Sequence, residues 1–220
     1  MRKMISVGLI ILGLIIIAGP YVYEKYEEEL QREQAAQYLE ESLALQTVLT
    51  QYEPEAIEEV SVNGLVDDME LQDGRTQPKE SYESVEYELN DIIGVIRIPS
   101  IDLELPIIEG SEAEQLAKGI GHIPYTDALG QFGNTGLAGH RSHTFGRLFN
   151  RLDELEKDDV IEVISGSYSY EYVVYDKIIV EPTEISVLNR NGDYRVLTLV
   201  TCDPMIDPTH RLIVHAYIPD

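Results

Sequence analysis

The stretch "VLTLVTCDPMIDPTHRLIVHAYI", from Val196 to Ile218, decides the fold of this chain. It holds two apolar runs of alternating character, separated by a loop with two Asp-Pro pairs. Alternation with a period of two, bounded by such turn residues, predicts two strands. The first would end at Cys202, the only cysteine of the chain, and the second would begin at Arg211. If the strands pair across the loop, Cys202 and Arg211 lie at the same end of a sheet, which is then a candidate site.

Further runs of β-branched and aromatic residues precede this stretch, separated by Gly, Asn, Pro and Asp. They are "IIGVIRIPSIDLELPIIEG", which starts at Ile92 and holds two strands, then "NTGLAGH", "DVIEVIS" and "YSYEYVVYDKIIVEP". About seven or eight short strands with few helices predict a mainly β fold, a mostly antiparallel barrel or sandwich. A short helix around 145–155 is the main exception that we expect.

The N-terminus has the composition of a membrane segment. Arg2 and Lys3 precede Met4 to Tyr23, about twenty residues without a charge, which as a helix would cross a hydrocarbon core of about 30 Å. Basic residues on the short N-terminal side predict that the rest of the chain is extracytoplasmic. A cleaved signal peptide is the alternative, although no A-x-A-like site follows the apolar run. We interpret residues 1–23 as a cytoplasmic tip and a single-pass transmembrane anchor in the cell membrane.

An acidic segment, residues 24–91, separates this anchor from the β-rich region. From Glu24 to about Tyr52 its composition predicts a helical stalk that holds the domain off the membrane. The thin apolar stripe of this helix consists of Tyr38, Leu39, Leu43, Leu45, Leu49 and Tyr52. The remainder has little to bury and is expected to be a linker of low order, or a flap over a groove. Residues 92–220 then form the globular domain.

Charge and cysteine content exclude some functions. Forty acidic residues against sixteen basic ones give a formal net charge of -24, which would repel nucleic acid phosphates. A single cysteine forms no internal disulfide, and on position alone it is more often a small buried hydrophobe than a nucleophile. The histidines are scattered and no C-x-x-C frame is present, so we expect neither a metal site nor a cofactor.

A catalytic cysteine needs a neighbour that favours the thiolate, because an ordinary thiol with a pKa of about 8.5 is mostly neutral at pH 7. His140, in "GLAGHRSHTFGRLF", follows Ala138 and Gly139, whose small size leaves room for the backbone of a ligand. Taken alone, His140 is more often a surface histidine than a base. His122, in "KGIGH", is expected to brace a loop.

The combination is more specific than its parts. "LAGH", then "TLVTC" about sixty residues later, then an arginine that opens the last strand, resembles the sortase family of cysteine transpeptidases. The resemblance covers Ile92 to Ile218 and includes "GVIRIPSIDLELPIIEG", "KGIGH" and "PTEISVL". It implies a closed eight-stranded β-barrel with short helices. It also implies that Cys202 is the nucleophile, His140 the acid and base, and Arg211 the positive group of the groove.

The resemblance further implies a reaction and its partners. Such an enzyme cleaves an LPXTG-like sorting signal of a surface protein through a thioacyl-enzyme intermediate. It then passes the acyl group to an amine of a peptidoglycan precursor or a pilin. Ala138 and Thr201 would line the substrate groove. The acidic segment lacks the Asp-Pro-aromatic tripeptide of pilin-polymerising members, and "YIPD" directly follows the last strand, which favours a single-pass class D or E enzyme.

A non-catalytic β-barrel, tethered to the membrane and binding a surface protein or wall polymer, is the alternative. An acidic stalk and a barrel fit either function. A binding module has no reason to assemble Cys202, His140 and Arg211, so the convergence of these residues on one face separates the two.

Overall fold

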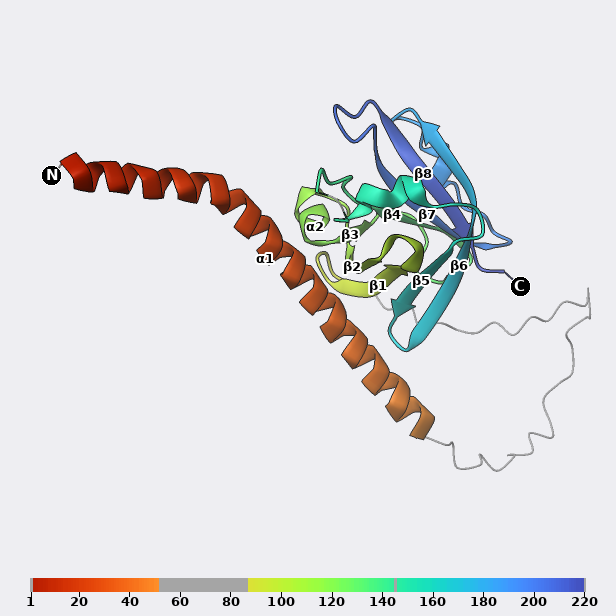
Figure 1. The fold of residues 1–220 in the computed structure, drawn as a ribbon. Helices are drawn as coiled ribbons and strands as arrows, with labels where there is room; N and C mark the ends of the chain where they lie inside the picture. Colours follow the sequence, from red (N-terminus) through yellow and green to blue (C-terminus); the bar gives the residue numbers. More distant parts are fainter. Residues whose placement is uncertain (1, 52–86, 145, 220) are drawn as a thin grey trace, which may run out of the picture.

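Eight strands close into a barrel in the structure, a computed structural model that describes residues 2–51, 87–144 and 146–219 (Figure 1). Side chains are described for 12–47 and for the two later ranges. The strands are β1 (Ile92–Ile98), β2 (Leu103–Glu109), β3 (Ile120–His122), β4 (Gly133–Ala138), β5 (Val160–Ser165), β6 (Tyr168–Val180), β7 (Arg195–Asp203) and β8 (His210–Tyr217). The helices are α1 (Arg2–Gln51) and α2 (Ala113–Lys118), with 3-10 turns η1 (Pro99–Ile101), η2 (Phe149–Glu154) and η3 (Ser186–Leu188).

The barrel has the strand order β1-β2-β3-β4-β7-β8-β6-β5. Two neighbouring pairs, β2 with β3 and β4 with β7, are parallel, and the others are antiparallel. The predicted mainly β, closed eight-stranded barrel is therefore confirmed. Closure removes free strand edges. It also places β4 beside β7, although about sixty residues separate them in the chain.

Alternate side chains of the strands fill the barrel interior. Leu199 of β7 and Val214 of β8 are opposed in the register and both are fully buried in the core cluster. Complete burial of such a side chain stabilises the fold by about 1.5–3 kcal/mol. Cys202 and Arg211 are opposed as well, three residues after Leu199 and three residues before Val214, so the same alternation directs them to the outer face.

Two short elements differ from the sequence expectation. "KGIGH" contributes the short strand β3, and the helix expected around 145–155 is the 3-10 helix η2. His122, at the end of β3, has its Nδ1 atom 2.8 Å from Glu109 Oε2 and its Nε2 atom 3.2 Å from the Asp127 carbonyl oxygen. His122 therefore braces the loop that follows β3, as predicted.

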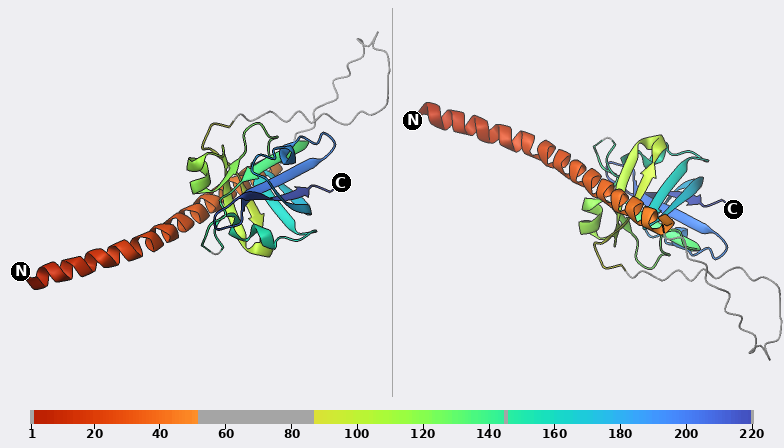
Figure 2. Two further views of the ribbon diagram at one scale, coloured as in Figure 1. Left: turned by 90° about the horizontal axis from the view of Figure 1, so that it is seen from above. Right: turned by 90° about the horizontal axis from the view of Figure 1, so that it is seen from below.

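The helix α1 runs alongside the barrel beside β1 and β2, and its N-terminal part extends beyond the barrel (Figure 1 and Figure 2). Its contact residues repeat at helical spacing and lie on one side of the helix. They are Gln31, Ala35, Tyr38 and Ser42. Leu43 and Leu45, from the predicted apolar stripe, are exposed instead. The contact face is thus made of small and polar side chains.

Tyr38 provides the central contact between α1 and the barrel. Its hydroxyl donates to the Ile93 carbonyl oxygen at 3.0 Å and accepts from the Gly166 N–H at 2.9 Å. Burial raises the pKa of the Tyr38 hydroxyl, so the group stays neutral. The helix predicted from Glu24 is present, but it packs on the barrel where a free stalk was the expectation.

Over the residues that the structure describes, no helix combines the length and the apolar character needed to cross a membrane. Part of the predicted anchor, 4–23, lies outside the residues with described side chains, and the anchor stays a prediction. Most of the predicted linker, 53–91, also lies outside the described residues.

Candidate active site

Three neighbouring strands bring together the three residues that the sequence singled out. β7 lies between β4 and β8, parallel to the first and antiparallel to the second. Cys202 and Arg211 are directly opposed across β7 and β8. On the other side of β7, the Gly139 N–H donates to the Val200 carbonyl oxygen at 3.0 Å, which continues the pairing past the end of β4. His140 therefore follows β4 at the level of Cys202.

These residues belong to the outer face of the barrel. Val200 is opposed to Ile213, and Thr198 to His215, in the next two outward rows of β7 and β8. The rows between them point into the core. The candidate site is therefore the end of one outward-facing surface that β4, β7 and β8 share.

The connection between β6 and β7 covers one part of this surface and leaves the other part open. The Asn134 side-chain amide donates to the carbonyl oxygens of Val187 at 3.1 Å and Asn189 at 3.2 Å, which ties the connection to β4. Ala138 and Cys202, nearer the open end, are partly exposed. A ligand can thus reach the surface at the end where the thiol lies.

Thr201, predicted to line the groove, faces the core. Its side chain is buried, and its hydroxyl donates to the Gly139 carbonyl oxygen at 2.8 Å. The prediction is wrong for Thr201 because neighbouring residues of a strand point to opposite faces, and Cys202 has the outer one. Ala138, the other predicted lining residue, lies on the outer face beside Val200.

Packing fixes the backbone that carries His140. The Phe149 N–H donates to the His140 carbonyl oxygen at 3.1 Å, and the Phe149 ring is fully buried beneath the loop. A Cβ atom at Gly139 would lie only 2.6 Å from Cδ2 of that ring. Gly139 is therefore required for the packing of Phe149, where the sequence suggested room for a ligand.

No hydrogen bond joins the side chains of the three candidate residues to one another. The Cys202 thiol is free and partly exposed. The exposed His140 ring makes no hydrogen bond or ion pair within the described part of the chain. Arg211 Nη1 donates to the His210 carbonyl oxygen at 2.9 Å.

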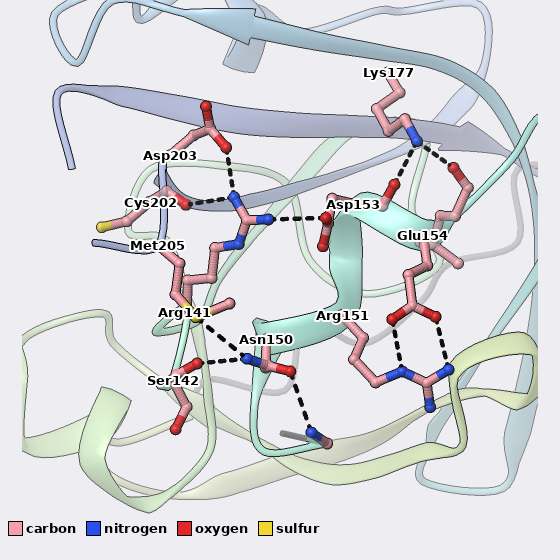
Figure 3. A network of polar contacts seen from close by, with 12 residues as sticks. Arg141, Ser142, Asn150, Arg151, Asp153, Glu154, Lys177, Cys202, Asp203 and Met205 are labelled. Atoms are coloured by element: carbon pink, nitrogen blue, oxygen red, sulfur yellow. Dashed lines mark hydrogen bonds and ion pairs between the residues drawn. The ribbon is translucent and has the colours of Figure 1, made fainter. Parts of the chain in front are cut away.

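A further charged residue, Arg141, lies in the loop between β4 and η2 that carries His140, here called the histidine loop, and joins it to β7 (Figure 3). Its guanidinium forms ion pairs with Asp203 and, at 3.0 Å, with Asp153, and its Nη1 atom lies 3.5 Å from the Cys202 carbonyl oxygen. The side chain is only 8% exposed. Sequence reasoning missed Arg141, because its partners are distant in the chain. The only available signal was an arginine directly after the candidate histidine.

His215 lies on the same outer face, further from the open end. Its Nδ1 atom is 3.1 Å from Thr198 Oγ1, and its ring stacks on Tyr175 with 5.8 Å between centroids. Burial lowers the pKa of the His215 imidazole, and the carboxylate of Asp176 raises it by a smaller amount. The neutral ring that results suits a structural role.

A closed β-barrel with a partly exposed thiol between a histidine-bearing loop and an arginine has the groups that an enzyme with a cysteine nucleophile needs. The sortase domain matches residues 96–218 of the chain. Sortase A of Bacillus anthracis is 26% identical over 212 residues, which cover 96% of this chain and 91% of that protein. The chain belongs to the sortase family, and it is a sortase-type cysteine transpeptidase.

Other relatives agree with this assignment. Sortase D of Bacillus subtilis is 33% identical over 111 residues, which cover 50% of this chain and 54% of that protein. The solved structure of a Clostridium perfringens sortase D5 transpeptidase has a TM-score of 0.57 and 31% identity, and the match covers 61% of this chain and 83% of that one. Enzymes named sortase A and sortase D both match, so the class D or E assignment stays a prediction.

Proposed function

We propose that the chain cleaves an LPXTG-like sorting signal and joins it to an amine, with Cys202, His140 and Arg211 as the catalytic residues. The observation that carries the proposal is their position at one end of three adjacent strands. Because neighbouring strands are about 4.8 Å apart, side chains from three of them can reach one substrate carbonyl. The convergence is unnecessary in a binding module, and it disfavours the non-catalytic alternative.

In the first half-reaction, the Cys202 thiolate attacks the carbonyl carbon of the threonine in the sorting signal. The protonated His140 ring donates its proton to the leaving nitrogen as the C–N bond breaks. A thioester on Cys202 and a free peptide amine result. The exposed position of His140 leaves its ring free to turn toward that nitrogen.

Arg211 stabilises the negative charge that develops on the carbonyl oxygen. Its side chain lies on the same face as the thiol and one strand away. One guanidinium nitrogen is held by the backbone at His210, which orients the planar group. The other N–H groups remain to bind the oxyanion or the substrate carbonyl.

In the second half-reaction, an amine attacks the thioester carbonyl while the neutral His140 ring accepts the amine proton. The new amide bond forms and the Cys202 thiolate leaves. The acyl donors would be surface proteins that carry the sorting signal. The amine would belong to a peptidoglycan precursor or to a pilin.

We place the catalytic domain outside the cytoplasm, on a single-pass anchor formed by residues 4–23. The basic pair Arg2 and Lys3 before about twenty uncharged residues supports this topology. Protease added to intact cells with an accessible wall should then degrade the barrel and leave the anchor in the membrane. Protection of the barrel until the cells are lysed would reverse the orientation.

Mass spectrometry of the full chain in detergent tests the reaction. The full chain is the right sample because α1 packs on the barrel. Peptides of LPXTG and LAXTG type should give a covalent adduct on Cys202, and hydroxylamine should convert that adduct to a hydroxamate. Cys202→Ala should give no adduct, and His140→Ala should slow turnover by about 10²- to 10⁴-fold.

Binding measurements separate this enzyme from the alternative. If no peptide of the panel forms an adduct, while Cys202→Ala binds a surface protein as tightly as the wild type does, the chain is a binding module. A wild-type adduct that persists in Cys202→Ala would place the nucleophile elsewhere.

A further inference from the structure

An ion-pair cluster lies beside the proposed active site, with the nearly buried Arg141 side chain at its centre (Figure 3). Asp203 follows Cys202 directly at the end of β7, and Asp153 belongs to η2. The guanidinium pairs with both carboxylates and approaches the Cys202 carbonyl oxygen at 3.5 Å. Arg141 itself follows His140 in the chain. One side chain thus connects the neighbours of the proposed acid and of the proposed nucleophile.

Several contacts link the histidine loop to β7, and they differ in how far they reach. The Gly139 N–H binds the Val200 carbonyl oxygen, and the Thr201 hydroxyl binds the Gly139 carbonyl oxygen. Both of these contacts are made by Gly139, the residue before His140. The Arg141 side chain makes the contact to β7 from the residue after His140, so the backbone is anchored on both sides of the histidine.

We propose that Arg141 is a positioning residue that sets the separation of His140 and Cys202, an inference that rests on the proposed function of those two residues. Figure 3 shows the Cys202 sulfur pointing away from the guanidinium, so Arg141 acts on the backbone of β7 and not on the thiol. Because Asp153 comes from η2 and Asp203 from β7, one planar group holds the loop and both elements in a single arrangement.

The geometry of the guanidinium explains why arginine is needed. Its planar fork of donors can bind two carboxylates in fixed directions, whereas an ammonium is a point charge without a fixed direction. A displacement of about 1 Å between reacting groups can slow a reaction about 10²-fold. Substrate binding depends less on the same separation. We therefore expect Arg141 to affect kcat more than KM.

The test compares Arg141→Met and Arg141→Lys with Arg151→Met in the full chain. Arg151 is a matched control, because it lies on η2, pairs with Glu154 at 2.7 Å and donates to the Ile101 carbonyl oxygen at 2.9 Å. It joins η2 to η1, away from β7. Transpeptidation of an LPXTG-type peptide gives kcat and KM per titrated Cys202 thiol, and melting temperatures are measured on the same samples.

Arg141→Met should lower kcat about 10²-fold with little change in KM. Arg141→Lys should lie between it and the wild type. Arg151→Met should lower the melting temperature and keep kcat. The proposal is overturned if Arg141→Met melts at a lower temperature but retains wild-type kcat. It is also overturned if Arg141→Met and Arg151→Met lose the same amount of kcat, because Arg141 is then only a structural residue.

Two carboxylate variants keep the proposal testable if Arg141→Met fails to fold. Asp203→Asn weakens the pair next to Cys202, whereas Asp153→Asn weakens a pair whose carboxylate side is 51% exposed. Asp203→Asn should lose more kcat than Asp153→Asn, and equal activities would contradict the proposal. If the wild type turns over no peptide, the proposed function fails, whatever Arg141 does. Amide hydrogen exchange at residues 140–144 then tests whether Arg141 fixes the histidine loop, since Arg141→Lys should speed exchange there and Arg151→Lys should not.

Discussion

Cys202 and Arg211 are directly opposed residues in the antiparallel register of β7 and β8. Opposed residues of this kind have Cα atoms about 4.5–5.5 Å apart and side chains on the same face. Their relation is fixed by the core, because a slip of one residue would turn Leu199 or Val214 out to solvent. The apolar pattern that folds the barrel therefore also keeps Cys202 and Arg211 opposite one another on the outer face.

Arg211→Lys should lower kcat/KM for an LPXTG-type peptide, and Arg211→Ala should lower it further. Removal of one donor from an oxyanion site typically slows a reaction about 10²- to 10³-fold. Lysine retains the charge but lacks the planar fork of donors, so its activity should fall between arginine and alanine. Arg190→Lys is the control, since the Arg190 side chain is 71% exposed in its pair with Asp127. Full activity of Arg211→Lys would show that charge alone suffices.

Gly139→Ala should lower both stability and activity. The added Cβ would meet the buried Phe149 ring at 2.6 Å, and overpacking of this kind typically costs about 1–3 kcal/mol. Relief of the clash should move the backbone that carries His140. Gly192→Ala is a matched control, because a Cβ there meets nothing within 4 Å. Thermal unfolding and peptide turnover of both variants check the prediction, and wild-type behaviour of Gly139→Ala would show that the loop adapts without loss.

The strands and the cysteine–arginine pair were predictable because their signals are local. Alternation in "VLTLVTC" and "RLIVHAYI" sets which residues face outward, and the short loop between them makes pairing natural. The same rule, applied strictly, also excludes Thr201 from the outer face. The sequence pattern was sufficient there, and the resemblance alone pointed to the wrong side of the strand.

Other features depend on contacts between distant segments. The parallel pairing of β4 with β7 brings His140 level with Cys202, and nothing in either strand specifies that register locally. Arg141 has partners in β7 and η2 for the same reason. The docking face of α1 lacks an apolar period, since Gln31 and Ser42 are polar, so composition favoured a free helix.

Tyr38→Phe should loosen α1 from the barrel without unfolding the barrel. The substitution leaves the Gly166 N–H without its partner, and an unsatisfied buried group typically costs about 1–3 kcal/mol. The Ile93 carbonyl oxygen loses the Tyr38 hydroxyl but still accepts from the Ser165 hydroxyl at 2.8 Å. Hydrogen exchange at the start of β1 and at the turn between β5 and β6 should speed up. Tyr26→Phe, at a 62% exposed position of the same helix, is the control. Equal exchange in the two variants would show that Tyr38 does not hold the helix.

His215 should make the barrel less stable as the pH falls below about 6.5, the ordinary pKa of histidine. Burial lowers the pKa of His215 in the folded chain, so between that lowered value and 6.5 the unfolded chain binds more protons. Stability contributed by the neutral ring is therefore fully present above pH 6.5 and is lost as the pH falls through the folded pKa. Asp176 is the charged group opposed to His215 on β6, and it weakens the effect without reversing it.

His215→Asn keeps a donor near the Thr198 hydroxyl but cannot become charged, so its stability should fall less steeply between pH 7 and pH 5. Urea unfolding of both proteins across this range measures the difference between their free energies of unfolding. The many carboxylates that the two proteins share affect both equally and cancel in this difference. Parallel curves would mean that His215 does not titrate differently in the folded and unfolded chains.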